Sequence, residues 1–537
     1  MTTDPDLQTD ILILGAGPTG LLLANLLLKM GVNYVIIDKK SKTTSEPKAV
    51  SIDDESMRAL QAVGLSHNIQ NITVRGYGSI YRGPNGRPFA EVKPISHEYG
   101  FDKRNGFHQP ELEKIMEDAL SSAENDCGVV FGTKLMHFDQ AEDYVDAYCA
   151  RSGQQETNIR AKFMVACDGG KSSIRKLLKI TMSGLTFEEP WLIVDLKSTQ
   201  NRSFHTEVFC DPSRPAITLP GPNGRRRYEF KLHKCEDQST VVKPEFVRRL
   251  LARFGPDADE DFERILVYTF HARIAKKWRE KRVFLAGDAA HLTPPFAGQG
   301  MNSGLRDAHN LGWKLAQACI SNKGISLLDS YEVERKPHAW EMISLACRMG
   351  QVMMPNSTLK GFILRGLFHT TKLFPPVRDY FYHMKFKPKP RFGSGMIWPD
   401  RFKTSDTLIG QMLCQPIVET IDAKHFLLDT LLPDQLIVLI YAERPEQMLN
   451  TITLEKLTNF GAAIFGITPE YIKPVEAEFS ICRDREKFFS QKPYANYLDH
   501  VLLIRRDRYI AASAPCESPL CLLEAVAALA PNCICEV

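Results

Sequence analysis

The residues best placed for chemistry are two aspartates that follow short apolar runs. Asp168 follows the run Phe163 to Ala166, and Asp288 follows the run Val283 to Ala286. Such runs, rich in β-forming residues and closed by glycine, predict buried strands. Because ligands of α/β sheets bind at the carboxyl ends of parallel strands, both acids are candidates for holding a ligand. An aspartate after a strand is also a common turn former, so Asp288 taken alone leaves both interpretations open.

The N-terminal stretch gives these acids a context. A strand over Asp10 to Leu14 leads into a glycine-rich turn and a helical pattern, and a second strand over Tyr34 to Ile37 ends in Asp38. In this arrangement the first glycine permits a tight turn, the second lets the backbone approach a pyrophosphate, and the third allows close helix–strand packing. The helix N-terminus offers free N–H groups to phosphates, and the acid can accept hydrogen bonds from a ribose. The predicted dinucleotide site consists of Gly15, Gly17, Pro18, Thr19, Gly20, Asp38 and Lys39.

Composition excludes several other functions. The chain of 537 residues has 44% hydrophobic and 24% charged residues and a net charge of only +3, which predicts neither nucleic acid nor an anionic membrane as partner. The basic runs Arg225 to Arg227 and Lys385 to Arg391 fit solvated loops. Leu21 to Leu28 is too short to span a bilayer. The 13 cysteines contain no C-x-x-C pair, so we expect no metal site, no disulfide framework and a cytoplasmic location.

The rest of the chain divides into segments of different pattern. Residues 188–271 are predicted to be rich in β-strands and could form a lid over a cofactor, and residues 305–354 are predicted to be helical. The stretch from Phe374 to Pro399 is rich in proline, aromatic and basic residues and is interpreted as a linker. An α/β pattern resumes beyond Leu408, with strands predicted at Gln435 to Tyr441 and His500 to Ile504.

Three motifs stand in order along the chain: Gly15-x-Gly17-x-x-Gly20, Cys167-Asp168-Gly169 and Gly287-Asp288. Together they resemble the single-component flavoprotein aromatic hydroxylases, the p-hydroxybenzoate hydroxylase class of FAD monooxygenases. The resemblance covers about residues 10–354. Within that class the chain is most similar to the 3-(3-hydroxyphenyl)propionate hydroxylases, on segments that include Gly298-Gln-Gly300-x-Asn302-Ser-Gly304 and Arg505-x-Asp507-Arg508-Tyr509.

The resemblance implies an α/β fold with three domains. A Rossmann-like FAD-binding domain would be discontinuous, over residues 1–75, 105–185 and 275–355, and would carry an inserted β-sheet substrate domain over residues 76–104 and 186–274. A helical or linker segment, 356–400, would lead to a C-terminal thioredoxin-like domain, 401–537. Because that domain has no C-x-x-C pair, we expect it to serve packing or dimerisation and not thiol exchange.

The resemblance also implies a set of FAD contacts. Asp38 would hold the adenosine ribose, Asp288 the ribityl–pyrophosphate region, and Asp168 both FAD and the nicotinamide nucleotide. Backbone N–H groups of Met301 and Asn302 would face the flavin pyrimidine carbonyl and stabilise negative charge on the reduced ring. The further contacts implied are Gly300 beside them, Gln109 at the flavin end, and Lys48. The family usually has arginine at the position of Lys48, and lysine lacks the bidentate fork of arginine towards phosphate.

Two candidate catalytic residues follow the central aspartate. By resemblance, the carbonyl of Pro295 would lie near the reacting centre of the substrate. His291 is a candidate for proton transfer, although a structural role at the strand-to-loop junction is the simpler interpretation. Arg104, His205 and Tyr228 could meet a substrate carboxylate or phenol. The loop Thr293 to Ala297 differs from that of the phenylpropionate hydroxylases, so the identity of the substrate stays open.

The activity implied is hydroxylation of a phenolic ring by FAD, NADH or NADPH, and O2, through a flavin C4a-hydroperoxide, with a 3-(3-hydroxyphenyl)propionate-like phenolic acid of aromatic catabolism as substrate. The alternative substrate is a polyketide or other polycyclic phenol. A flavin-dependent halogenase shares the fold, but its tryptophan-rich signature is missing here, and a non-catalytic FAD-binding protein is a further alternative. The oligomeric state is open, with a homodimer as one possibility.

Overall fold

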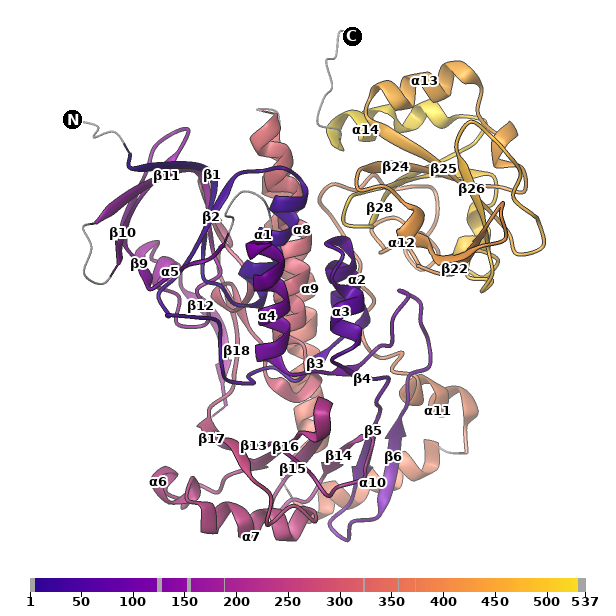
Figure 1. The fold of residues 1–537 in the computed structure, drawn as a ribbon. Helices are drawn as coiled ribbons and strands as arrows, with labels where there is room; N and C mark the ends of the chain where they lie inside the picture. The colour runs from indigo at the N-terminus through magenta and orange to yellow at the C-terminus, as the bar shows by residue number, and fades with distance from the viewer. Residues whose placement is uncertain are drawn as a thin grey trace. The chain divides into compact units, whose positions relative to one another are not determined.

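The computed structural model describes residues 5–122, 128–151, 156–187, 189–321, 324–355, 357–371 and 373–529. The chain folds into two compact units (Figure 1). The first comprises Met1–Ser96, Asp102–Ala308 and Ala339–Pro388, and the second comprises His97–Phe101, His309–His338 and Lys389–Val537. The second unit therefore takes in segments that the sequence alone placed with the FAD-binding and substrate domains.

The centre of the first unit is a mainly parallel sheet with the order β19-β20-β11-β1-β2-β8. Residues 11–14 of β1 are at most 4% exposed, as expected for a strand buried on both faces. The parallel pairing of β1 with β2 and β11, and of β11 with β20, brings the carboxyl ends of these strands to one edge. Asp38 at the end of β2, Asp168 after β11 and Asp288 after β20 therefore lie at this edge. The strands are β1 (Leu7–Leu14), β2 (Tyr34–Asp38), β8 (Val130–Phe131), β11 (Thr157–Ala166), β19 (Arg279–Glu280) and β20 (Val283–Leu285), with β9 (Thr133–Gln140) and β10 (Val145–Arg151) as a hairpin on β11.

Helices and short strands surround this sheet. Helix α1 begins directly after the glycine-rich turn and lies beside α4, where Asn25 Nδ2 donates to Met116 O (Figure 1). The helices are α1 (Pro18–Lys29), α2 (Asp54–Ala62), α3 (Ser66–Gln70), α4 (Gln109–Ser121) and α5 (Ser173–Leu177). Two small three-stranded sheets accompany them, formed by β3 (Ser51–Ile52), β7 (Asn105–Gly106) and β4 (Val74–Arg75), and by β12 (Met182–Thr186), β18 (His271–Ala275) and β21 (His291–Leu292).

A second sheet of seven strands confirms the predicted β-rich insertion. Its order is β17-β13-β16-β15-β14-β5-β6. One face of this sheet packs on α7, whose apolar residues Val247, Leu250 and Leu251 repeat at helical spacing. The prediction for this region contained only strands and missed α7. The elements are β5 (Ser79–Arg82), β6 (Pro88–Val92), β13 (Trp191–Leu196), β14 (Thr206–Phe209), β15 (Ala216–Pro220), β16 (Arg226–Lys231), α6 (Gln238–Val241), α7 (Pro244–Phe254) and β17 (Phe262–Tyr268).

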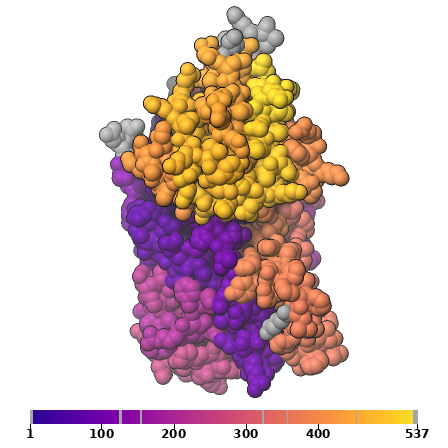
Figure 2. All heavy atoms as spheres, turned by 90° about the vertical axis from the view of Figure 1, so that its right-hand side faces the viewer, coloured from indigo at the N-terminus to yellow at the C-terminus, as the bar shows by residue number. Residues whose placement is uncertain are grey.

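Further helices follow in the segment expected to be helical or a linker. Long helices α8 (Gly300–Ile320) and α9 (Ile325–Met353) confirm the predicted helical region. They are followed by α10 (Thr358–Thr371) and α11 (Pro375–Tyr382). Of these, only α11 falls in the stretch from Phe374 to Pro399, so the linker interpretation is wrong for residues 375–382 alone. Proline is tolerated in the first helical turn, which is where Pro375 and Pro376 lie. The two helices form part of the surface seen in salmon and orange in Figure 2.

The second unit contains a seven-stranded sheet of order β23-β22-β26-β25-β24-β27-β28. Strands β24 and β25 are parallel and are joined by α13, and β24 also pairs with the antiparallel hairpin β27–β28, which α14 follows. This is the thioredoxin-like arrangement expected from the sequence. Its core includes Ile437, Leu439 and Leu502. The elements are β22 (Ile417–Thr420), β23 (His425–Leu427), α12 (Leu428–Leu431), β24 (Leu436–Tyr441), α13 (Thr451–Asn459), β25 (Ala462–Thr468), β26 (Ser480–Asp484), β27 (His500–Ile504), β28 (Ile510–Pro515) and α14 (Leu523–Leu529).

A buried ion cluster connects α8 and α9 to the C-terminal segment of this unit. Glu334 lies at its centre, and its carboxylate accepts from Lys314 Nζ at 2.6 Å and from Arg505 Nη1 at 2.7 Å. All three side chains are fully buried, and Arg505 also pairs with Asp507 at 2.7 Å. These contacts explain why residues 309–338 belong to the second unit, and they give the Arg505-x-Asp507 motif a structural role.

Candidate functional site

A cavity of about 990 Å³ lies within the first unit. One end is formed by the loops at the carboxyl edge of the parallel sheet, and the other is formed by one face of the seven-stranded sheet and by α9. The volume is at the upper end of the range usual for cofactor and ligand sites. Of the predicted site residues, the cavity is lined by Gly15, Gly17, Pro18, Thr19, Asp38, Lys39, Lys48, Gln109, Asp168, Asp288, Pro295, Gly300 and Met301.

The glycine-rich turn has the geometry that a phosphate cradle needs. Gly15 has φ +109°, and a Cβ there would lie 2.4 Å from the carbonyl oxygen of Cys167. A Cβ at Gly20 would lie 2.0 Å from the carbonyl oxygen of Gly15, so this glycine, which does not line the cavity, serves close packing. A Cβ at Gly17 would meet nothing within 4 Å, which leaves open space beside the N-terminus of α1. A pyrophosphate fits this position because the helix N-terminus points free N–H groups into it.

Asp38 fixes the turn from the end of β2. Its Oδ2 accepts from Ala16 N at 2.9 Å, and its Oδ1 accepts from Lys40 N at 2.8 Å. Each carboxylate oxygen can accept further hydrogen bonds, and the residue lines the cavity. Contact with a ribose hydroxyl therefore stays a prediction that this geometry allows.

Asp168 joins the end of β11 to α5. Its Oδ2 accepts from Ser173 N at 2.7 Å and from Ser173 Oγ at 3.0 Å, while its Oδ1 is buried and has no hydrogen-bond partner among the described residues. The side chain of Arg175, in α5, donates to Ala289 O at 2.8 Å and to Gly170 O at 2.7 Å. The two aspartate motifs are thus tied to each other, and one oxygen of Asp168 is left for a ligand.

Asp288 points its carboxylate into the cavity from the short turn Gly287–Ala289. Its side chain has no hydrogen bond to any part of the chain that the structure describes. The pKa of Asp288 is raised because surrounding protein atoms desolvate the carboxylate, an effect that His291 and Lys48 oppose. An unsatisfied acceptor of this kind suits the hydroxyl groups of a ribityl chain, which can donate to it.

His291 lies outside the cavity lining and is fully buried. Its Nε2 is 2.6 Å from Asp307 Oδ2, and the same carboxylate oxygen accepts from Gly287 N at 3.0 Å. The histidine therefore holds, through Asp307, the turn that presents Asp288. This position favours the structural interpretation of His291 and gives it no access to a substrate proton.

The start of α8 lies at the cavity, and its backbone is held in place by Asn302. The Oδ1 of Asn302 accepts from Asp53 N at 3.0 Å, and its Nδ2 donates to Gly298 O at 2.6 Å. Because the side chain is used internally, only the backbone N–H remains for a ligand. The first helical hydrogen bond runs from Ser303 N to Gln299 O, so the N–H groups of residues 300–302 are the free donors of a helix N-terminus.

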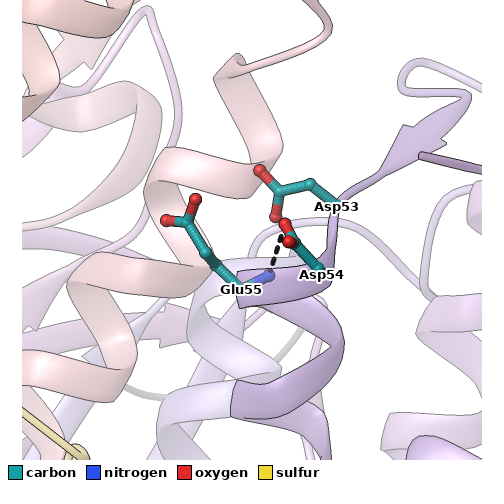
Figure 3. A group of neighbouring side chains, drawn as sticks. All are labelled: Asp53, Asp54 and Glu55. Carbon is teal, nitrogen blue, oxygen red and sulfur yellow. Dashed lines mark hydrogen bonds between the residues drawn. The ribbon is translucent and has the colours of Figure 1, made fainter. Parts of the chain in front are cut away.

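Three buried carboxylates meet at the start of α2: Asp53, Asp54 and Glu55 (Figure 3). Their oxygens are close enough to hold a metal ion, but two cationic side chains already bind them. Arg306 Nη1 is 2.8 Å from Asp53 Oδ2, and Lys387 Nζ is 2.7 Å from Glu55 Oε1. Burial raises the pKa of Asp54 to about 7. The cluster therefore fastens α2 to α8 and to the segment that carries Lys387.

A second polar network holds the loop that contains Lys48. Gln109 Oε1 accepts from Ala49 N at 2.7 Å. The guanidinium groups of Arg227 and Arg264 both bind Asp195 and donate to main-chain carbonyls of residues 47 and 48. The side chain of Lys48 itself is exposed to the cavity. Lys48 therefore presents a positive charge to the cavity.

The other end of the cavity is mainly apolar. Phe296 packs against Phe187, Trp191 and Phe270, with ring centroids 5.5 to 5.9 Å apart. Pro295 lines the cavity beside it, and its carbonyl accepts from Gly298 N at 2.8 Å, so one lone pair is already used. The remaining apolar wall consists of Tyr81, Val92, Ile193, Val208, Ile217, Leu219, Leu266, Tyr268, Leu345, Met349, Met353, Met384 and Phe386.

The structure separates the three polar residues suggested for the substrate. Arg104 lines the cavity, whereas His205 and Tyr228 do not. His205 Nδ1 accepts from Gly78 N, and Tyr228 Oη donates to Asp257 Oδ2. Sequence reasoning missed Glu229, which lines the cavity and is 4% exposed. Burial raises its pKa, and its nearest cation is Arg227, at 3.8 Å. Arg227, Glu229 and Lys231 alternate along β16, and this pattern is typical of a solvent-exposed face. Only the position of β16 in the sheet shows that Glu229 faces the cavity.

Comparison with known proteins decides the family. Residues 8–346 match the family model of the FAD binding domain, and residues 410–528 match that of the HcaD C-terminal domain. A 3-(3-hydroxy-phenyl)propionate/3-hydroxycinnamic acid hydroxylase of Klebsiella pneumoniae is 34% identical over 528 residues, which cover 96% of this chain and 94% of that protein. The chain belongs to the FAD-dependent aromatic hydroxylases.

Other members of the FAD-dependent aromatic hydroxylases agree with this assignment. The corresponding hydroxylase of Escherichia coli SMS-3-5 is 35% identical over 475 residues, 87% of this chain and 85% of its own. Two solved structures share the fold. The flavin-dependent monooxygenase PieE aligns with a TM-score of 0.79 and 18% identity over 98% of this chain and 99% of its own. Aklavinone-11 hydroxylase, solved with FAD and aklavinone, aligns with a TM-score of 0.77 and 21% identity over 98% of this chain and 100% of its own.

The predicted fold class and class of enzyme are therefore confirmed. The protein is an FAD-dependent monooxygenase with a Rossmann-like FAD-binding fold and an inserted substrate sheet. The residues present fit FAD, since open space at Gly17, an unsatisfied carboxylate at Asp288 and the free N–H groups of α8 line one cavity. Within the described ranges, no helix is long and apolar enough to cross a membrane.

Proposed function

We propose that this monooxygenase hydroxylates the ring of a phenolic acid of the 3-(3-hydroxyphenyl)propionate type, with NADH or NADPH and O2 as co-substrates. The relatives named for that activity match nearly the whole chain at 34% identity, including the substrate sheet. A polycyclic phenol is the second candidate, because a relative in structure, aklavinone-11 hydroxylase, was solved with aklavinone.

The observation that carries the proposal is the single cavity with two chemically different ends. The dinucleotide end offers helix N-termini and carboxylates, and the substrate end offers an aromatic and apolar wall beside Pro295 and Phe296. Bound FAD would accept hydride and activate O2, while the protein supplies position and electrostatics. The close packing of Phe296 against three aromatic rings would help to exclude water from this end of the cavity.

We further propose that Glu229 accepts the phenolic proton of the substrate. A phenolate ring is a better nucleophile than a phenol, so a base in the cavity accelerates oxygen transfer. Glu229 lines the cavity and is deeply buried, and burial raises its pKa, which makes the carboxylate a stronger base than an exposed one. The neighbouring Asp195 keeps Arg227 and Arg264 occupied, so neither cation fully neutralises Glu229.

The remaining parts of the proposal concern the chain as a whole. We propose that residues 1–75, 105–185 and 275–355 bind FAD, that residues 76–104 and 186–274 bind the substrate, and that residues 401–537 serve packing or dimerisation. A cytoplasmic location without nucleic acid or membrane as partner is part of the same proposal. The ten cysteines that the structure describes as free support a reducing compartment.

The test is NADH and NADPH oxidation with O2 uptake across a panel of phenols, followed by mass spectrometry of the products. The panel contains 3-(3-hydroxyphenyl)propionate, 3-hydroxycinnamate, a neutral monocyclic phenol and a polycyclic phenol. We expect one added oxygen per NAD(P)H with the phenolic acids. Hydroxylation of only the polycyclic phenol would replace the proposed substrate class, and NAD(P)H oxidation without any hydroxylated product would refute the proposed activity on these phenols.

A further inference from the structure

We infer that Arg104, Ser79 and Thr206 form a subsite for the carboxylate of the substrate at the apolar end of the cavity. The inference rests on the proposed function, because it assigns one end of the proposed phenolic acid. The subsite also extends the proposed function, since it names the residues that would distinguish a phenolic acid from a neutral phenol.

Arg104 has no carboxylate partner in the part of the chain that the structure describes. It lines the cavity, and its Nη1 donates to Ser79 Oγ while its guanidinium lies over the ring of Tyr77, 4.6 Å from the centroid. That is the one hydrogen bond its side chain makes with the residues the structure describes, so four of the five N–H donors of a guanidinium remain. The hydrogen bond and the ring fix its orientation and leave its charge uncompensated.

Three other cations that line the cavity, Arg227, Arg264 and Lys387, are already paired. Arg227 and Arg264 share Asp195, at 2.6 and 2.9 Å. Lys387 binds the carboxylates at the start of α2, at 2.7 Å from Glu55 Oε1. An incoming anion would have to displace a buried ion pair at each of these residues, which is unfavourable. At Arg104 it would meet a free partner.

Thr206 supplies the second, independent observation. The residue is 3% exposed, lines the cavity, and its Oγ1 has no hydrogen-bond partner among the described residues. A buried hydroxyl without a partner costs free energy, so a ligand group that completes it is favoured. Thr206 is the direct pairing partner of Ser79 across β14 and β5, and paired residues point their side chains to the same face.

The three side chains thus make a polar corner in an otherwise apolar wall. A carboxylate has two acceptor oxygens and a negative charge, which match guanidinium and hydroxyl donors, whereas an amide or ester of the same shape brings no charge. Tyr81 and Val208, two residues further along the same paired strands, also line the cavity. They offer the apolar contact that a propionate or propenoate chain would need on its way to the ring.

The experiment compares acid and amide in wild type, Arg104→Met, Arg104→Lys and Thr206→Val. Binding of 3-phenylpropionate and of 3-phenylpropanamide to the FAD-loaded protein is followed by the change in flavin absorbance, and KM and kcat are measured for the corresponding 3-hydroxyphenyl compounds. Arg75→Met is the matched control, because Arg75 pairs with Asp102 on the surface and does not line the cavity.

We expect Arg104→Met to raise the Kd and KM for the acid at least 30-fold and to leave those for the amide within threefold, with kcat little changed. Arg104→Lys should restore part of the affinity for the acid, and Thr206→Val should raise its Kd about fivefold. FAD content and melting temperature show whether each variant is folded, and Thr206→Val tests the subsite if Arg104→Met fails to fold.

The two proposals fail in different ways. Equal loss of acid and amide binding in Arg104→Met, or an unchanged preference for the acid in both variants, would overturn the subsite. The same holds if wild type binds the acid no better than the amide. If 3-phenylpropionate binds in an Arg104-dependent way but no phenolic acid is hydroxylated, the subsite stands and the proposed activity falls.

Discussion

Replacing Gly17 by valine gives the sharpest test of the FAD site. Gly17 precedes α1 with φ −85° and ψ −178°, an extended conformation that valine adopts readily, and nothing lies within 4 Å of its Cβ position. The FAD-free variant should therefore fold as wild type does. The added methyl groups would occupy the space that a pyrophosphate needs in order to reach the N–H groups of α1.

The expected loss follows from the hydrogen bonds that would no longer form. Each hydrogen bond from a backbone N–H to a charged phosphate oxygen contributes about 1.5–3 kcal/mol. Losing two of them would raise the Kd for FAD by about 10²- to 10⁴-fold, since each 1.4 kcal/mol is a factor of ten. FAD at 100 times its wild-type Kd stabilises the wild type by about 2.7 kcal/mol, and this stabilisation should be nearly absent in the variant.

The assay is flavin titration by fluorescence together with melting curves with and without FAD. Gly20→Ala serves as the contrast, because its Cβ would lie 2.0 Å from the carbonyl oxygen of Gly15. That substitution should lower the melting temperature of the FAD-free protein, unlike Gly17→Val. A Gly17→Val protein that binds FAD within threefold of the wild type would refute the assignment of this turn to the pyrophosphate.

Four further substitutions test other parts of the site and fold. Asp288→Asn should weaken FAD binding, because the amide loses the negative charge and one acceptor oxygen at the cavity, and FAD titration with an unchanged Kd would contradict this. Glu229→Gln should lower the rate of hydroxylation at least 10²-fold. Wild-type activity should fall as the pH drops through the raised pKa of Glu229, and the variant should lack this dependence. An unchanged pH profile would exclude Glu229 as the base. His291→Phe should destabilise the protein, because Asp307 loses its hydrogen bond to the imidazole. It should keep kcat per bound FAD within about threefold, and a 10²-fold fall at full FAD occupancy would restore a catalytic role. Glu334→Gln should cost about 3–5 kcal/mol in urea unfolding at pH 7. Because Lys314 and Arg505 hold the pKa of Glu334 well below 4.5, that deficit should shrink as pH falls below 4.5, and a pH-independent deficit would argue against the ion cluster.

The sequence predicted the parts of the site that depend on local order. A glycine-rich turn, a helix N-terminus and an acid at a strand end are each set by neighbouring residues, and the parallel pairing of β1, β2 and β11 then brings them together. The pairing itself follows from the βαβ pattern. Asp168 and Asp288 could therefore be placed at one edge from apolar runs alone.

The substrate end could not be predicted in the same way. Ser79 and Thr206 are neighbours only because β5 pairs with β14, strands separated by more than a hundred residues in sequence. Nor could the sequence show that Asp195 would occupy both Arg227 and Arg264 and leave Arg104 unpaired. The linker prediction failed over residues 375–382 for a local reason, since it rested on composition, and prolines are also tolerated where a helix such as α11 begins.

The methionines at the substrate end carry a consequence for the lifetime of the enzyme. Met349, Met353 and Met384 line the cavity, and their flexible thioethers let the wall repack around ligands of different shape. The same sulfur atoms are oxidised by H2O2, which a monooxygenase releases whenever a poorly fitting ligand leaves the reactive oxygen unused. Each sulfoxide would turn an apolar contact into a polar one and loosen the seal further. Turnover with poorly fitting substrates would thus oxidise the methionines that allow these substrates to bind. The number of turnovers before the enzyme is inactivated would therefore depend on how well the substrate fits.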